Sequence, residues 1–275
     1  MPAERETNEP LRTAIASLFH ALWADYIALT PSAARIHQLL GGGAPIVNDH
    51  IALRSFALPG LGMDALGSHF LALGYHEGGN YRFVQKKLRA RHYQHPDPEV
   101  PKVFISELLL DECSAELRDC VQGLLAQMDH SAVRDPEILY SGRHWELASA
   151  DYRALLEESE YAAWLAAFGF RANHFTVSVN HLDGFATLAQ VNEALKSADF
   201  SLNTAGGEIK GSAAVFLEQS STLADVVPVW FSDGEHAIPS CFYEFAFRHR
   251  QPDGTLYQGF VEASADRIFE STNAR

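Results

Sequence analysis

The fold of this chain is decided by a strand-like stretch, Asn48-Asp49-His50-Ile51-Ala52-Leu53-Arg54, and by two later stretches that repeat its pattern. Successive side chains of a β-strand point to opposite faces, so Ile51 and Leu53 share one face and His50 lies on the other. The stretch therefore offers an apolar face for a core and a polar face for a cavity.

The two later stretches each bring one further metal-binding residue type to a polar face. They are Asn173-His174-Phe175-Thr176-Val177-Ser178-Val179 and Phe242-Tyr243-Glu244-Phe245-Ala246-Phe247-Arg248. Their bulky residues lie opposite His174 in the first and opposite Glu244 in the second. Two histidines and one carboxylate form the ligand set that holds non-haem Fe(II) with open coordination positions. The pattern predicts a metal site on His50, His174 and Glu244.

Each of these residues also has a purely structural interpretation. A histidine in a strand is more often a hydrogen-bonded structural residue than a ligand, and Glu244 has an alternative partner in Arg248, four residues further on the same face. A carboxylate among aromatic residues is costly to bury without a partner, and a bound cation removes that cost. The equivalent places of His50 and His174 favour metal binding.

Two cations are candidates for binding an acidic substrate. Arg54 shares a strand face with His50 and lies roughly 13 Å further along the strand, from where its side chain can lean back toward the metal cavity. Its planar guanidinium suits a carboxylate, and a structural salt bridge is the alternative. Lys210, in a glycine-rich turn, is predicted as a second cation near the cavity mouth. The segment 92–95, which ends next to prolines, is interpreted as a solvated turn.

The order of elements predicts an α+β fold with an internal repeat. Two helices over 11–40 form a preface to the first strand. Strand, helix and then three strands follow in module one, about 46–110, and recur in module two, about 172–250, after helices over 114–128 and 150–168. We expect two β-α-β-β-β modules that curl into one open barrel around the metal site, and residues 1–275 to form a single catalytic domain.

Composition narrows the class of protein. The chain of 275 residues is 47% hydrophobic and 20% charged, as in an ordinary soluble globular protein. Its net charge of −14 argues against a nucleic-acid partner, which requires a basic surface. No apolar run is long enough to cross a membrane, and the polar start does not resemble a secretory signal. A cytoplasmic location is therefore predicted.

Several motifs together resemble the 2-oxoadipate dioxygenase/decarboxylase family, over about residues 15–262. They are Asn48-Asp49-His50-Ile51-Ala52-Leu53-Arg54, Pro101-Lys102-Val103-Phe104-Ile105-Ser106-Glu107-Leu108, Gly206-Gly207-Glu208-Ile209-Lys210-Gly211-Ser212, Leu217-Glu218-Gln219-Ser220-Ser221-Thr222-Leu223-Ala224-Asp225 and Tyr243-Glu244-Phe245. The family is similar in fold to vicinal-oxygen-chelate enzymes such as hydroxymandelate synthase. Its best-known bacterial members are longer, with additional substrate contacts near the C-terminus, so the resemblance leaves the exact 2-oxo acid open.

The resemblance implies Fe(II) on His50, His174 and Glu244, and a substrate carboxylate on Arg54. It implies that a small 2-oxo dicarboxylic acid and O2 react with loss of CO2 and hydroxylation of the shortened acid, as in lysine catabolism. From 2-oxoadipate the product would be 2-hydroxyglutarate. Two other functions remain open at this point. One is a glyoxalase-like lyase or isomerase that uses Zn, Ni or Mn, and the other is a non-catalytic protein that binds a small acid or a metal.

Overall fold

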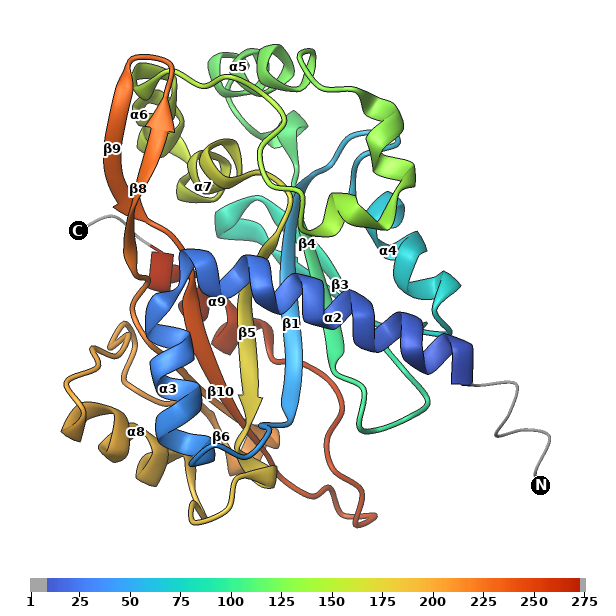
Figure 1. Ribbon diagram of the computed structural model, residues 1–275, viewed down its shortest axis with the longest axis vertical. Coiled ribbons are helices and arrows are strands. Elements are labelled where there is room, and N and C mark those ends of the chain that lie inside the picture. The colour runs from blue at the N-terminus through green and yellow to red at the C-terminus, as the bar shows by residue number, and fades with distance from the viewer. Residues whose placement is uncertain (1–8, 273–275) are drawn as a thin grey trace.

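A computed structural model gives the structure of residues 9–272, which is built on one curled sheet (Figure 1). Its strands are β1 (Asn48–Phe56), β2 (His76–Phe83), β3 (Leu88–Gln94), β4 (Lys102–Leu108), β5 (Ala172–Ser178), β6 (Lys210–Ser212), β7 (Leu217–Ser221) and β10 (Phe242–Arg248). They lie side by side in the order β2-β3-β4-β1-β5-β10-β7-β6.

The sheet consists of two matching halves that meet between β1 and β5. β1 is parallel to β4 in the first half, as β5 is to β10 in the second, and the remaining pairs within each half are antiparallel. One helix follows the first strand of each half, α4 (Met63–Ala72) and α8 (Leu188–Ser197). The predicted α+β fold, with two β-α-β-β-β modules in a half-open barrel, is confirmed.

The strand β8 (Val226–Phe231) lies outside the sheet. It pairs with β9 (Gly234–Pro239), which was not predicted, in a two-stranded hairpin inserted between β7 and β10. Figure 1 shows this hairpin projecting beside the sheet, next to α6. Pro228 within β8 cannot donate a ladder hydrogen bond, which is compatible with a two-stranded ribbon but not with the centre of a large sheet.

The helices outside the repeat are α2 (Glu9–Leu29), α3 (Pro31–Gly41), α5 (Ala115–Leu125), α6 (Ser149–Glu158), α7 (Glu160–Phe168) and α9 (Glu262–Ile268). The prediction of a single helix over 150–168 is wrong. The helix is interrupted at Ser159, whose hydroxyl accepts a hydrogen bond from the amide of Ala162 and caps the start of α7. The C-terminal α9 was not predicted. Within residues 9–272, none of the helices has both the length and the apolar character needed to cross a bilayer.

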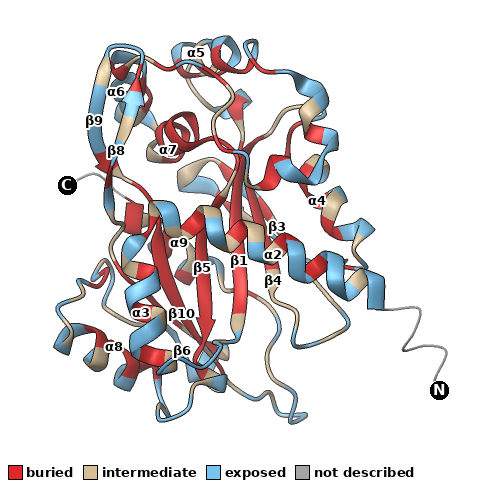
Figure 2. Cartoon of the chain, viewed as in Figure 1, coloured by how far each residue is buried: buried red, intermediate tan, exposed pale blue. Residues whose placement is uncertain are grey.

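The two faces of the sheet have different neighbours. α2 packs against the outer face, where Trp23 and Tyr26 lie with ring centroids 5.0 and 4.9 Å from Phe175. Tyr26 also donates a hydrogen bond of 2.5 Å to the carbonyl of Phe242. Figure 2 shows that the central strands are buried along most of their length. The opposite, concave face carries His174. The C-terminal segment, which includes the short 3₁₀ helix η7 (Phe269–Thr272), packs on this face.

Candidate metal centre

Three adjacent strands bring the predicted metal ligands together. His174 of β5 is paired with Ala52 of β1 on one side and with Phe242 of β10 on the other, which places His50 and Glu244 beside it. The side chains are buried, with exposures of 2% for His50, 6% for His174 and 1% for Glu244. Their ligand atoms all lie within 4.8 Å of one another, and they form the only such group of three among residues 9–272.

The hydrogen bonds around the two rings leave lone pairs directed at one point. His50 Nδ1 lies 2.8 Å from Asp49 Oδ1, and His174 Nδ1 lies 3.3 Å from Asn173 Oδ1. Because these oxygens accept, each Nδ1 carries the proton and each Nε2 of a neutral ring presents a lone pair. Those Nε2 atoms lie 3.7 and 3.1 Å from the oxygens of Glu244. His50 Nε2 also lies 3.1 Å from the hydroxyl of Thr176. Three potential ligand atoms grouped in this way suit a cation, so the residues fit a metal ion.

The pKa values agree with a metal-binding state of the ligands. Burial lowers the pKa of His174, so the ring is neutral near pH 7 and can act as a ligand. Burial alone would raise the pKa of Glu244, but the neighbouring His50 and His174 hold it below its ordinary value. A neutral imidazole beside an ionised carboxylate is the protonation state in which these groups bind a divalent metal.

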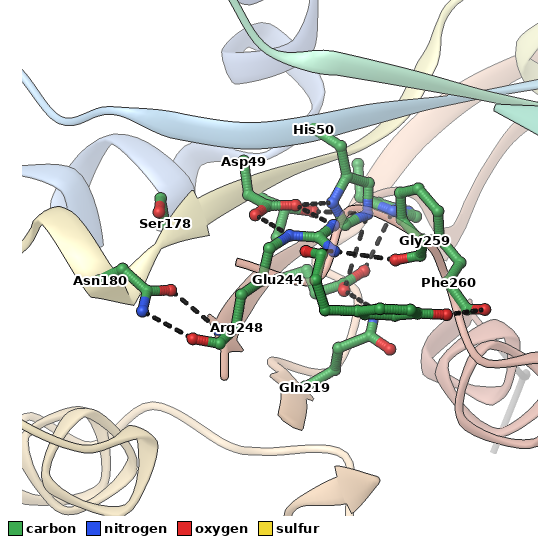
Figure 3. Close-up of polar contacts among 12 residues, drawn as sticks. Asp49, His50, Ser178, Asn180, Gln219, Glu244, Arg248, Gly259 and Phe260 are labelled. Atoms are coloured by element: carbon green, nitrogen blue, oxygen red, sulfur yellow. Dashed lines mark hydrogen bonds and ion pairs between the residues drawn. The ribbon is translucent and has the colours of Figure 1, made fainter. Parts of the chain in front are cut away.

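Asp49 and Arg248 fix the orientation of His50 (Figure 3). Asp49 accepts from His50 through Oδ1, and its two oxygens accept from Arg248 Nη2 at 2.8 Å and from Nε at 2.6 Å. The charge of Arg248 keeps the pKa of Asp49 well below its usual range, although burial alone would raise it. Arg248 thus pairs with Asp49 and not with Glu244, which had been its alternative partner.

A β-bulge precedes each of the two histidines. Neighbouring strand residues normally face opposite ways, yet the pairing of β1 with β5 slips by one residue at Asp49 and again at Asn173. The extra residue turns its side chain toward the histidine that follows it. Gln219 orients the third ligand, because its Nε2 donates to Glu244 Oε1 at 2.6 Å. The sequence contained a signal for the first two, since Asp and Asn immediately precede the two histidines.

A small cavity lies against the three ligands. Its volume is about 20 Å³, room for about one water molecule. Apart from Gln219, the other lining residues are apolar: Phe104, Phe260, Ala265, Ile268 and Phe269. Three of these, Ala265, Ile268 and Phe269, belong to the C-terminal segment 265–269, which the sequence analysis did not place at the site. Apolar side chains must move aside before an organic acid reaches the ligands.

Arg54 lies behind this apolar wall and does not line the cavity. Its side chain is 1% exposed, and its guanidinium lies 4.8 Å from the ring centroids of both Tyr161 and Trp164 and 5.8 Å from that of Phe269. It forms the salt bridge that was the alternative interpretation, with Glu160 at 3.3 Å. Arg54 is not among the residues that line the cavity at the candidate ligands, so its substrate role stays a prediction.

Lys210 lies deeper than a cation at a cavity mouth would. It is buried, and its ammonium group donates to the backbone carbonyls of Asn203 and Glu208. Burial lowers its pKa to about 8. It is not among the residues that line the metal cavity. Its predicted role in substrate binding is therefore untested by these contacts.

The interpretation of the segment 92–95 as a solvated turn is wrong for His92. β3 continues to Gln94, and His92 is buried within it, where Nδ1 accepts from the Gly79 amide and the Tyr81 hydroxyl. Burial lowers the pKa of His92 to about 4. A side chain at Gly78 would lie 2.0 Å from His92 Nε2, so the glycine is what leaves room for the ring.

Comparisons with known proteins show which family this chain resembles. A family model described as 2-oxoadipate dioxygenase/decarboxylase matches residues 7–253. A protein of Oryza sativa subsp. japonica, named 2-oxoadipate dioxygenase/decarboxylase, chloroplastic/amyloplastic, is 33% identical over 275 residues, which cover 90% of this chain and 76% of that protein.

Two solved structures are also similar to this chain. The crystal structure of the hydroxyglutarate synthase in complex with 2-oxoadipate from Oryza sativa matches with a TM-score of 0.90 and 31% identity, over 96% of this chain and 93% of that one. A crystal structure from Shewanella frigidimarina, of a protein named as a candidate hydrolase, matches with a TM-score of 0.88 and 58% identity, over 90% of this chain and 98% of that one. By the family model and the curated relative, this chain belongs to the 2-oxoadipate dioxygenase/decarboxylase family.

Proposed function

We propose that this protein is an Fe(II)-dependent dioxygenase that converts 2-oxoadipate and O2 to 2-hydroxyglutarate and CO2. The observation that carries the proposal is the buried group of two histidines and one glutamate, which is the ligand set of non-haem iron oxygenases. Membership of a family of this name supports it. So does the relative from rice, which is described in complex with 2-oxoadipate.

Different residues of this chain would bind the metal, exclude water and bind the substrate. His50, His174 and Glu244 would hold the metal ion. When bound, Fe(II) would supply the redox chemistry through which the 2-oxo acid, which is the net reductant, reacts with O2. The apolar wall excludes water from the reacting atoms. Arg54 binds the remote carboxylate of the substrate once that wall has moved, which orients the chain of the acid.

Oxygen consumption tests this function directly. Anaerobically Fe(II)-loaded protein given 2-oxoadipate and air is expected to consume one O2 for each CO2 and each 2-hydroxyglutarate formed, and the His174→Ala variant is expected to consume none. Loading with Zn(II) is expected to give no turnover. O2 uptake without CO2 release, or turnover that survives in His174→Ala, would contradict the proposal. Isomerase or lyase products formed with Zn, Ni or Mn would support a glyoxalase-like function instead.

Replacement of Arg54 with Met is expected to lower kcat/KM for 2-oxoadipate by about 100-fold or more, since truncation of one partner of a buried charge pair costs about 2–5 kcal/mol. Turnover of 2-oxohexanoate, which has no remote carboxylate, is expected to change by less than about threefold. Steady-state O2 uptake with both acids measures the difference, and Arg35→Met, at an exposed arginine on α3, is the control. Equal losses with the two acids would assign Arg54 a structural role only.

A further inference from the structure

Arg54 is a buried cation whose hydrogen bonds are incomplete. Its Nη2 donates to the Thr272 hydroxyl at 3.0 Å and its Nη1 to Glu160 at 3.3 Å, while Nε has no acceptor among residues 9–272. A guanidinium has five donors in a planar fork and binds a carboxylate best through two parallel hydrogen bonds. Glu160 contacts only one nitrogen, so the best carboxylate geometry at Arg54 is not used.

Glu160 is only partly buried and makes a single ion pair in the described part of the chain. It is the first residue of α7, and its side chain is 20% exposed, whereas the guanidinium it faces is fully buried. The Arg54 contact is the one salt bridge that it makes within residues 9–272. A partly exposed carboxylate keeps some of its hydration in its contact with Arg54, so this ion pair contributes less than a fully buried one. Glu160 can therefore leave Arg54 if another anion replaces it.

A second cavity gives the Glu160 carboxylate a place to go. Its volume is about 240 Å³, and it is lined by Lys86, Lys87, Glu158, Glu160 and Phe269 among others. Among residues 9–272, Lys86 has one distant partner, Asp266 at 4.0 Å, whereas Lys87 is paired with Glu158 at 2.8 Å. A carboxylate that turned from Arg54 into this cavity would meet water and the charge of Lys86.

Phe269 lies between this cavity and the metal site. Its side chain lines both cavities and contacts the Arg54 guanidinium, 5.8 Å from the ring centroid. Phe269 thus contacts Arg54 and lines both the cavity at the candidate ligands and the cavity at Glu160. A dicarboxylic acid that is bound to the metal at one end and displaces Phe269 brings its other carboxylate to the guanidinium.

On the basis of the function proposed above, we infer that Glu160 is a placeholder for the remote carboxylate of the substrate. Glu160 neutralises Arg54 in the free protein and yields the guanidinium to the incoming carboxylate by turning into the 240 Å³ cavity. A monocarboxylic 2-oxo acid has no second carboxylate to replace Glu160 and leaves the Arg54–Glu160 pair intact. Glu160 thus sets how strongly the site prefers dicarboxylic over monocarboxylic acids.

Calorimetric titration under anaerobic conditions tests this inference, because without O2 the substrate binds but does not react. Fe(II)-loaded and metal-free protein are each titrated with 2-oxoadipate and with 2-oxohexanoate. Glu160→Gln removes the competing charge, so its Kd for 2-oxoadipate is expected to fall about tenfold, the effect of one charge-assisted hydrogen bond. Its Kd for 2-oxohexanoate is expected to stay within about twofold of the wild-type value.

Two further variants separate this role from a structural one. Glu160→Asp keeps a negative charge at the start of α7 but withdraws it from Arg54, and an intermediate Kd for 2-oxoadipate is expected. Glu158→Gln removes the same charge from the wall of the same cavity without touching Arg54, and no selective change is expected. Thermal unfolding of each variant, with and without 2-oxoadipate, verifies that it is folded.

The outcomes distinguish this inference from the proposed function. Equal Kd values for 2-oxoadipate in the wild type and in Glu160→Gln, or weaker binding of both acids in the variant, would overturn the placeholder role while O2-coupled turnover stands. Tighter binding of 2-oxoadipate alone by Glu160→Gln, in a protein that shows no O2-coupled turnover, would support the placeholder role and overturn the dioxygenase function.

Discussion

Replacement of Glu244 with Gln is expected to weaken divalent metal binding by about 100- to 1,000-fold and to abolish O2-coupled turnover. Zinc sites with four protein ligands contribute about 10–16 kcal/mol, so one ligand corresponds to about 2.5–4 kcal/mol. Glu244 is the only anion among the three candidate ligands, so its loss also removes the charge that balances the cation. Anaerobic titration with Fe(II), read out by calorimetry, measures the affinity.

The same variant is expected to keep its stability when no metal is present. In the metal-free protein the Glu244 carboxylate is 1% exposed, and its desolvation costs free energy that a neutral amide costs less of, which offsets the favourable contacts with His50 and His174. The wild type is expected to gain thermal stability with added Fe(II), by mass action, and the variant is not. Glu218→Gln, on the neighbouring β7, is the control. Metal affinity in Glu244→Gln within about threefold of the wild-type value would exclude Glu244 as a ligand.

Strand periodicity was sufficient to predict the convergence of the three candidate ligands. A period of two fixes which face each side chain takes, and a face with bulky residues such as Phe175 and Tyr243 must be covered by other elements. The structure places those two aromatic rings against α2, with Trp23 and Tyr26. His174 and Glu244 were thereby left on the concave face, where the register of three adjacent strands aligns them with His50.

The supporting contacts could not be predicted, because they depend on departures from that periodicity. A regular strand would point Asp49 away from His50, and only the bulge at Asp49 reverses it. Arg248 meets Asp49 across 199 positions of sequence, which no local pattern encodes. Much of the cavity wall comes from Phe260 and from the C-terminal segment 265–269. The short helix α9 in this region is largely polar, and its pattern is too weak to be placed at a site.

The surroundings of Arg54 could not be predicted from the strand that carries it. Its strand face was predicted, but α7 brings Tyr161 and Trp164 over its guanidinium, and η7 brings Thr272. Aromatic faces stabilise a buried guanidinium without using its donors. The cation is therefore kept dry with hydrogen-bonding capacity to spare, a state that suits a ligand carboxylate better than a purely structural salt bridge does.

Replacement of Arg248 with Met is expected to reduce the free energy of unfolding by about 3–5 kcal/mol, because it leaves the buried carboxylate of Asp49 without its cation. Metal affinity is expected to fall about 10- to 100-fold as well, since Asp49 then no longer holds the His50 ring in a fixed orientation. The variant also loses two donations from Arg248 Nη1, to the carbonyls of Tyr257 at 3.0 Å and Gly259 at 2.8 Å.

The double variant Asp49→Asn/Arg248→Met separates these two effects. Removal of both charges leaves no unpaired buried ion, so much of the lost stability is expected to return, whereas the metal affinity is not. Urea unfolding of the metal-free proteins and anaerobic Fe(II) titration measure the two quantities, with Arg250→Met, at an exposed arginine two residues further on, as the control. If metal affinity returned together with stability, Asp49 and Arg248 would support only the fold. If it stayed low in a stable protein, their function would be to orient the histidine that completes the metal site.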